Sequence, residues 1–187
     1  MLVDLRSRFD EVLAQLESVA GWKTVQRPVQ ILGSLDGIET GVRQLIRSEP
    51  LETTVVSYLG ADIVVPTEAE ILRIKGALIL KRNATRDYLD FVALAAHMGD
   101  ERVARALQPF DRLYPQESGE SPLQQLQAQL ANPLPHDLKV TELPEYKSLD
   151  PRWHDWNAVK VACAHLAAII FDRVCELMER ASGKEEI

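Results

Sequence analysis

The sequence has little cysteine and few aromatic residues, and we expect no export signal at its N-terminus. Its 187 residues include two cysteines, Cys163 and Cys175, and aromatic residues make up 6% of the chain. The two cysteines fall in one helical pattern, about 18 Å apart along its axis, which is too far for a disulfide within a helix. Because the N-terminus lacks the apolar stretch of a signal peptide, we expect reduced thiols and a cytoplasmic location.

Long apolar runs and an excess of basic residues are also absent. No run of about 18 apolar residues occurs, so the sequence predicts no membrane span. Lys and Arg number 21 against 28 Asp and Glu, a formal net charge of −7. This acidity argues against a protein that coats nucleic acid without sequence preference. The histidines and cysteines show no metal-ligand spacing, and we predict no metal site among them.

Apolar periodicity predicts an α+β fold, with a small mixed sheet flanked by helices and a helical C-terminal half. An amphipathic first helix is expected to end before Gly21. Strands are predicted at 29–32, 53–58 and 62–66, and the last two read as a hairpin. We expect two regions, 1–66 and 67–187, or one continuous domain.

Helical spacing dominates after residue 66. Thr67 and Glu70 fit a capping box, in which each residue satisfies a backbone N–H of the other. Further helices are expected at 67–82, 86–97, 100–113, 122–130 and 151–180. Asp150 is the expected N-cap of the last helix, with Pro151 at its first position. The proline-containing segment 132–150 is predicted to be a connector.

A basic cluster stands out in this acidic chain. Residues 71–85 contain four cations and no acid. On one continuous helix, Lys75, Arg82 and Arg86 would lie within about 40° of each other. Asp90 would lie on nearly the same stripe. The cluster is therefore the strongest candidate for a functional site.

Two interpretations of this cluster are open. Arg and Lys bind phosphate oxygens through charge-assisted hydrogen bonds, and Asp87 and Asp90 could hold Mg²⁺ or accept a proton. Alternatively, Arg86 and Asp90 form an ordinary i,i+4 ion pair worth a few tenths of a kcal/mol, and the cations are a solvated face. A helix break at Asn83 would remove the alignment, but the groups could still converge across the turn.

The runs 66–77 and 82–91 resemble the abortive-infection AbiEii/AbiGii toxin-type nucleotidyltransferases. That family has a Lys on a helix after the sheet, then an Arg, then an Arg/Lys-Asp-x-x-Asp element. The resemblance implies a nucleotidyltransferase-like fold, an NTP with Mg²⁺ in any active form, and a role in toxin–antitoxin systems or phage defence. It implies catalytic roles for Lys75, Asp87 and Asp90, and substrate-binding roles for Arg82 and Arg86.

The metal-binding motif of that family is missing. It consists of Gly-Gly or Gly-Ser followed about ten residues later by Asp-x-Asp, whose carboxylates ligate Mg²⁺. No Asp-x-Asp occurs in the sequence. We therefore expect the fold to lack its N-terminal catalytic segment, and the protein to bind NTP or phosphate with incomplete catalysis. The alternative is a non-enzymatic binding or regulatory module that pairs with an antitoxin protein or an RNA, and a homodimer is a further expectation.

Overall fold

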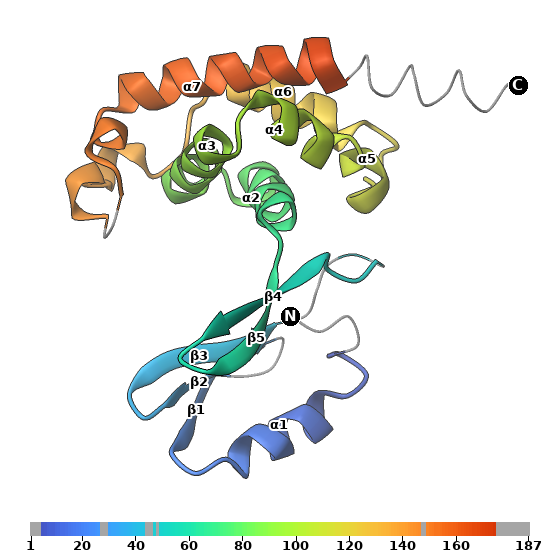
Figure 1. Cartoon of the computed structure of the whole chain (residues 1–187), viewed down its shortest axis with the longest axis vertical. Coiled ribbons are helices and arrows are strands. Elements are labelled where there is room, and N and C mark those ends of the chain that lie inside the picture. The colour runs from blue at the N-terminus through green and yellow to red at the C-terminus, as the bar shows by residue number, and fades with distance from the viewer. Residues whose placement is uncertain (1–4, 27–29, 44–46, 48, 147–148, 175–187) are drawn as a thin grey trace, which may run out of the picture. The chain divides into compact units, whose positions relative to one another are not determined.

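The computed structural model has the α+β architecture that the sequence predicts (Figure 1). It describes residues 5–26, 30–43, 47, 49–146 and 149–174. The chain forms two compact units, Met1–Pro50 and Leu51–Ile187. The division predicted at residue 66 falls after the second hairpin, whereas the compact units divide before it. In the described ranges, no helix is both long and apolar enough to cross a membrane.

The first unit packs one helix against a three-stranded antiparallel sheet. The elements are α1 (Phe9–Glu17), β1 (Trp22–Gln26), β2 (Gln30–Leu35) and β3 (Ile38–Arg43), with the strands in the order β1-β2-β3. Val12 and Leu13 of α1 are buried with Leu5 and with Ile31 of β2. The sequence did not predict β1 or β3. β2 and β3 form a hairpin whose turn, at Asp36 and Gly37, has positive φ at both residues, as type I′ turns require.

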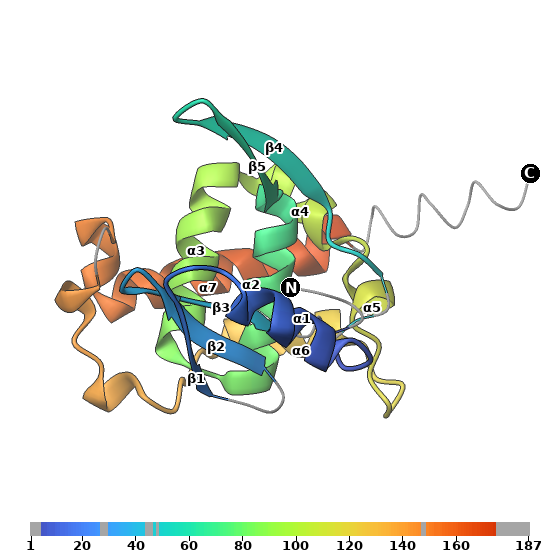
Figure 2. The ribbon, with the colours of Figure 1, turned by 90° about the horizontal axis from the view of Figure 1, so that it is seen from below.

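The second unit begins with the predicted hairpin, which the structure confirms. Strands β4 (Thr53–Tyr58) and β5 (Ala61–Pro66) pair antiparallel, and Leu59 and Gly60 turn the chain with positive φ. Figure 2 shows the hairpin as a narrow ribbon that runs into α2. Its large apolar side chains are exposed: Val55, Val56, Tyr58, Leu59, Ile63 and Val64.

Helices form the body of the second unit. They are α2 (Glu68–Arg82), α3 (Thr85–Met98), α4 (Asp100–Leu107), α5 (Phe110–Leu113), α6 (Pro122–Ala131) and α7 (Trp156–Ile169). Their buried faces share one apolar core that includes Phe91, Phe110 and Leu126. Gly76 lets α2 approach that core closely, because a Cβ there would lie 2.9 Å from Leu126 Cδ2 and 3.2 Å from Phe110 Cε2.

Two predicted helices are interrupted in the structure. The helix expected over 100–113 breaks between α4 and α5, where Pro109 has no N–H to donate. The helix expected from 151 begins as a 3₁₀ turn, Pro151–His154, and α7 starts only after Asp155, whose side chain accepts a hydrogen bond from the Asn157 N–H. A π-helical turn, Ile170–Val174, follows α7, and residues 175–180 of the prediction lie outside the described residues.

Candidate functional site

The helix that carries the basic cluster breaks at Asn83. This residue ends α2 in the left-handed conformation, with a φ of 46°, and α3 begins two residues later. The continuous charged stripe is therefore not formed. The turn brings the last residues of α2 beside the first residues of α3, so the predicted groups converge by folding back rather than by helical spacing.

Asp87 lies at the centre of this cluster. Its side chain is fully buried and accepts two hydrogen bonds from Arg82, at 3.0 Å from Nε and 2.7 Å from Nη2. Two parallel N–H···O bonds of this kind form the strongest Arg–carboxylate geometry. The helix ends support the pair, since Arg82 lies in the last turn of α2 and Asp87 in the first turn of α3.

Asp90 is the second carboxylate of the cluster, and it lies near Lys75 and Arg86. Its Oδ2 lies 2.5 Å from Lys75 Nζ, and Lys75 Nζ also lies 3.9 Å from Asp87 Oδ1. Arg86 Nε is 3.9 Å from Asp90 Oδ2, and the Arg86 side chain is 66% exposed. Arg86 is therefore held much more loosely than Lys75 or Arg82.

All five predicted site residues thus meet in one network of ion pairs between α2 and α3. Lys75 and Arg82 already hold carboxylates of the chain itself. None of the five lines the pocket beside β2 and β3 or the pocket at the start of α2. The charged residues that stand out in the sequence are explained by ion pairs that join α2 to α3. The catalytic and substrate-binding roles remain predictions.

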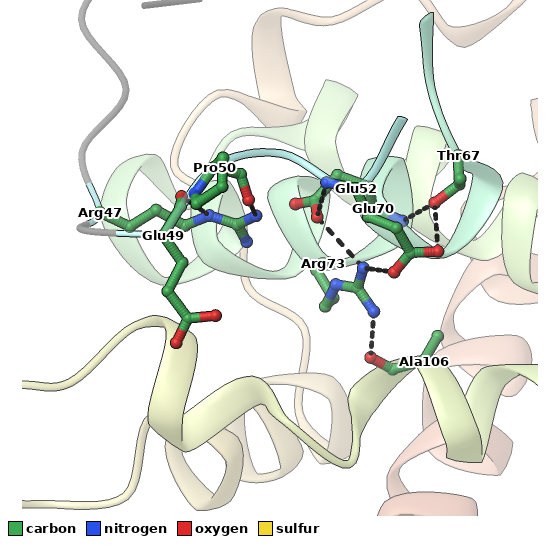
Figure 3. A network of polar contacts seen from close by, with 8 residues as sticks. All are labelled: Arg47, Glu49, Pro50, Glu52, Thr67, Glu70, Arg73 and Ala106. Atoms are coloured by element: carbon green, nitrogen blue, oxygen red, sulfur yellow. Dashed lines mark hydrogen bonds and ion pairs between the residues drawn. The ribbon is translucent and has the colours of Figure 1, made fainter. Parts of the chain in front are cut away.

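A second polar network, which the sequence did not predict, centres on Arg73 (Figure 3). The Arg73 side chain is 6% exposed, and its Nη1 donates to the Ala106 carbonyl over 3.1 Å. Its Nη2 lies 2.6 Å from Glu52 Oε2 and 3.1 Å from Glu70 Oε2. Glu70 is fully buried and also accepts the Glu52 N–H over 3.1 Å. Arg73 therefore joins the hairpin base to α2 and α4.

The predicted capping box is half confirmed by this network. Thr67 Oγ1 accepts the Glu70 N–H over 3.1 Å, as expected. In a full capping box the Thr67 N–H would donate to the Glu70 carboxylate, but here it donates to the Glu52 carbonyl over 3.0 Å. The Glu70 carboxylate accepts hydrogen bonds from Arg73 Nη2 and from the Glu52 N–H. Glu52 lies too far away in the sequence for helix-cap patterns to reveal it.

A third network secures the turn between α2 and α3. Asp137 Oδ1 accepts hydrogen bonds from both the N–H and the hydroxyl of Thr85, each at 2.7 Å. Asn83 Nδ2 donates to the Leu134 carbonyl over 2.8 Å, and the His136 N–H donates to the Asn83 carbonyl over 3.0 Å. Asp137 thus caps α3 from the connector, and no local pattern in the sequence indicates this contact.

Asp137 makes a pH-dependent contribution to stability. Partial burial opposes ionisation, but the hydrogen bonds from Thr85 outweigh it and lower the pKa of Asp137. A lowered folded-state pKa stabilises the fold above the unfolded value of about 3.9, and this stabilisation is lost as pH falls through the folded value. We expect Asp137→Asn to destabilise the protein at pH 7 and to cost progressively less below about pH 4, measured by urea unfolding from pH 2 to pH 7. A constant cost over that range would contradict this assignment.

Two other groups that could react, the Cys163 thiol and the Tyr88 hydroxyl, belong to residues that are buried in the core. Burial raises the pKa of the Cys163 thiol to about 12, which removes its nucleophilic form at neutral pH. Tyr88 is buried, its hydroxyl donates to Asn83 Oδ1 over 2.7 Å, and its ring meets Trp156 edge-on at 6.0 Å. Among the described residues, no group of three or more His, Cys, Asp or Glu side chains is placed to hold a metal ion.

Comparison with known proteins points to transport proteins of mycobacteria. No protein-family model matches the sequence, and no solved structure matches it. The chain is 43% identical over 98 residues to the haem uptake protein MmpL11 of Mycobacterium tuberculosis H37Rv, covering 49% of this chain and 10% of that protein. It is 33% identical over 132 residues to the mycolic acid-containing lipids exporter MmpL11 of Mycolicibacterium smegmatis, covering 67% and 13%. A probable transport protein MmpL11 of Mycobacterium leprae is 32% identical over 130 residues, covering 67% and 12%.

These relatives overturn the resemblance to AbiEii/AbiGii nucleotidyltransferases. All three are named MmpL11 and are described as uptake, export or transport proteins, not as nucleotidyltransferases or toxins. The prediction of an NTP- or phosphate-binding toxin-type protein is therefore wrong, and its alternative, a module for an antitoxin protein or an RNA, has no support either. The physical reason is that Lys, Arg and Asp at these spacings also satisfy one another across a helix–turn–helix contact, as they do here.

The similarity includes the helices that carry the charged cluster. The alignments with the M. smegmatis and M. leprae proteins each cover 67% of the chain. A continuous stretch of that length must include the middle third of the chain, wherever the stretch begins. The middle third contains α2, α3 and α4. The chain spans only about a tenth of the length of the curated relatives it matches. Its similarity is thus to one segment of MmpL11 transport proteins, and that segment includes the core of the helical unit.

Proposed function

We propose that the helical unit, residues 51–187, acts as an accessory domain in transport of the MmpL11 type. The observation that carries this proposal is the similarity to MmpL11 proteins through α2, α3 and α4. The named activities of the relatives differ, since one is a haem uptake protein and another exports lipids that contain mycolic acid. We therefore propose a role in transport and leave the identity of the transported molecule to experiment.

The contacts of the unit suit a domain with a fixed shape. Arg73 joins the hairpin base to α2 and α4, and the Arg82–Asp87 pair closes α2 on α3. Asp137 ties the connector to the start of α3. Each contact joins segments that are distant in sequence or separated by a turn, so together they hold the helices in one arrangement. A domain of this kind can act on a larger protein by docking as a rigid body.

An exchange of segments tests the proposal. In M. smegmatis, the MmpL11 segment that aligns with this chain is either deleted or replaced by the aligned residues of this chain. Export of mycolic acid-containing lipids is measured by thin-layer chromatography of surface lipids. We expect the deletion to abolish export and the exchange to restore most of it.

A folding-defective variant is the matched control. The exchange that also carries Arg73→Met should export little, because the domain loses the buried partner of Glu70. Membrane levels of every protein are measured by immunoblot. Normal export by the deletion strain would show that the aligned segment has no part in transport. No export by an exchanged protein present at the wild-type level would show that this chain cannot perform the part of that segment, which would contradict the proposal.

A further inference from the structure

We propose that two copies of this chain pair through the outer edge of β4, so that their β4–β5 hairpins form one continuous sheet. Within the described ranges, β4 has no strand neighbour other than β5. All of its residues, Thr53–Tyr58, are exposed. This pairing does not depend on the transport role proposed above, and it gives a surface to the homodimer that we expect from the sequence.

The backbone of β4 has free groups along its outer edge. Residues of an antiparallel strand alternately turn their N–H and C=O groups toward the partner strand and away from it. The Glu52 carbonyl accepts the Thr67 N–H over 3.0 Å, which continues the β4–β5 ladder, so Glu52 and every second residue after it face β5. Thr53, Val55 and Ser57 therefore turn their backbone groups outward, where another strand can bond them.

The two edges of the hairpin differ in how they are protected. Natural sheets block open edges with charged residues, prolines or bulges. The outward residues of β5 are Asp62, Val64 and Pro66, of which the first is charged and the last has no N–H to donate. β4 contains neither a charged residue nor a proline, and its register with β5 is unbroken. A complete ladder can therefore form on β4 but not on β5.

The hairpin also exposes apolar side chains that a larger sheet would cover in part. Five of them, from both strands, are 45–68% exposed: Val55, Val56, Tyr58, Ile63 and Val64. A two-stranded hairpin is marginally stable in water and gains stability when further strands extend it. A partner strand on β4 would supply this stability.

A second copy is the partner because the edge of β4 is complementary to itself. A two-fold axis through Val55 sets this residue opposite the second copy's Val55, and sets Thr53 opposite the second copy's Ser57. Apolar then meets apolar and polar meets polar, and no like charges are brought together because β4 has none. All outward residues of both strands are paired, with about six backbone hydrogen bonds. Any other symmetric register leaves one outward residue of each copy unpaired.

The same register joins the apolar side chains of the two hairpins. Val64 lies opposite Val55 within each hairpin, so one row across the sheet consists of valines alone. On the other face, Val56 has Ile63 on one side, within its own hairpin, and the second copy's Thr54 on the other. Cross-strand neighbours of this β-branched kind stabilise a sheet.

The size of the interface sets the expected strength of the dimer. Pairing along one strand of six residues buries less than about 1,200 Å², the size of transient rather than obligate complexes. We therefore expect a reversible dimer whose population rises with protein concentration.

Hydrogen exchange at low and high protein concentration tests the edge. Exchange of single amides is followed by NMR on the full chain, and analytical ultracentrifugation gives the dimer fraction in the same samples. We expect the N–H groups of Thr53, Val55 and Ser57 to exchange at least about tenfold more slowly where the dimer dominates. The outward N–H groups of Asp62 and Val64 should exchange at the same rate at both concentrations.

Two proline substitutions test which edge pairs. Val55→Pro removes an outward N–H of β4 and should abolish the dimer, although it removes no bond between β4 and β5. Val64→Pro makes the same change on the outer edge of β5, and this matched control should still form the dimer.

Two charge variants test the register. Thr53→Lys with Ser57→Lys sets lysines opposite one another in the dimer and should abolish it, whereas Thr53→Glu with Ser57→Lys sets opposite charges together and should retain it. Both variants lose the hydrogen bond from Ser57 to Asp62, so the difference between them reports the pairing of residue 53 alone.

Four results would overturn the proposal. The first is a chain that stays monomeric at the highest concentration. The second is slow exchange of Thr53, Val55 and Ser57 at every concentration, because a strand of the same chain would then cover the edge. The others are a Val64→Pro protein that loses the dimer as Val55→Pro does, and equal dimer formation by the two charge variants.

Discussion

Replacing Arg73 with methionine is expected to lower the free energy of unfolding of the helical unit by about 3–5 kcal/mol, the usual cost of breaking a buried ion pair. Arg73 and Glu70 are both buried, and their charged atoms lie 3.1 Å apart. The substitution keeps most of the side-chain volume but leaves the Glu70 carboxylate without the guanidinium in a site of low polarity. The measurement is urea unfolding at pH 7, followed by circular dichroism at 222 nm.

A double substitution identifies the cause of this loss. Glu70→Gln combined with Arg73→Met removes both charges. We expect the double variant to recover more than half of the free energy of unfolding that Arg73→Met loses. Lys139→Met, at an exposed site, should change stability by less than about 0.5 kcal/mol. An Arg73→Met protein within about 1 kcal/mol of the wild type would show that the pair is not an important part of the core.

Replacing Arg82 with methionine should have the next largest effect, a loss of about 2–3 kcal/mol. Asp87 is fully buried and would lose both of its close hydrogen bonds from Arg82, with Lys75 remaining at 3.9 Å. The expected loss is smaller than that for Arg73, because Arg82 is 43% exposed and water can replace part of the interaction. The same urea unfolding experiment gives the value.

Two variants make this test specific. Arg86→Met removes a cation from the same cluster, but Arg86 is 66% exposed and 3.9 Å from Asp90, so the cost should be less than about 0.5 kcal/mol. Arg82→Lys keeps the charge but loses the bidentate geometry, and its stability should fall between those of the wild type and Arg82→Met. Equal losses for Arg82→Met and Arg86→Met would contradict the assignment of Asp87 as a buried partner.

Most of the helical unit could be predicted because its signals are local. The hairpin, the Thr67 cap and the helix predicted at 122–130 each depend on residues a few positions apart, and each is present in the structure. Strands β1 and β3 were missed because their signals are weak. β3 is largely exposed and contains a glycine, so it lacks the alternation of buried residues that marks a strand.

The residues of the charged cluster were correctly predicted to lie close together, but the function assigned to the protein from them was wrong. The stripe predicted for Lys75, Arg82, Arg86 and Asp90 on one helix is not formed, but the turn at Asn83 brings these residues and Asp87 into one network. Spacing does not show whether charges face a ligand or one another. Only the turn at Asn83 decides this, because it brings the carboxylates of α3 onto the cations of α2.

The sequence by itself determined the α+β class, the second hairpin and the approximate positions of the helices, because periodicity, turns and caps act between neighbouring residues. The tertiary structure alone decided that Glu52 joins Glu70 and Arg73 and that Asp137 caps α3. These contacts join residues that are distant in the chain. Their energy depends on burial and on distances that no local pattern encodes.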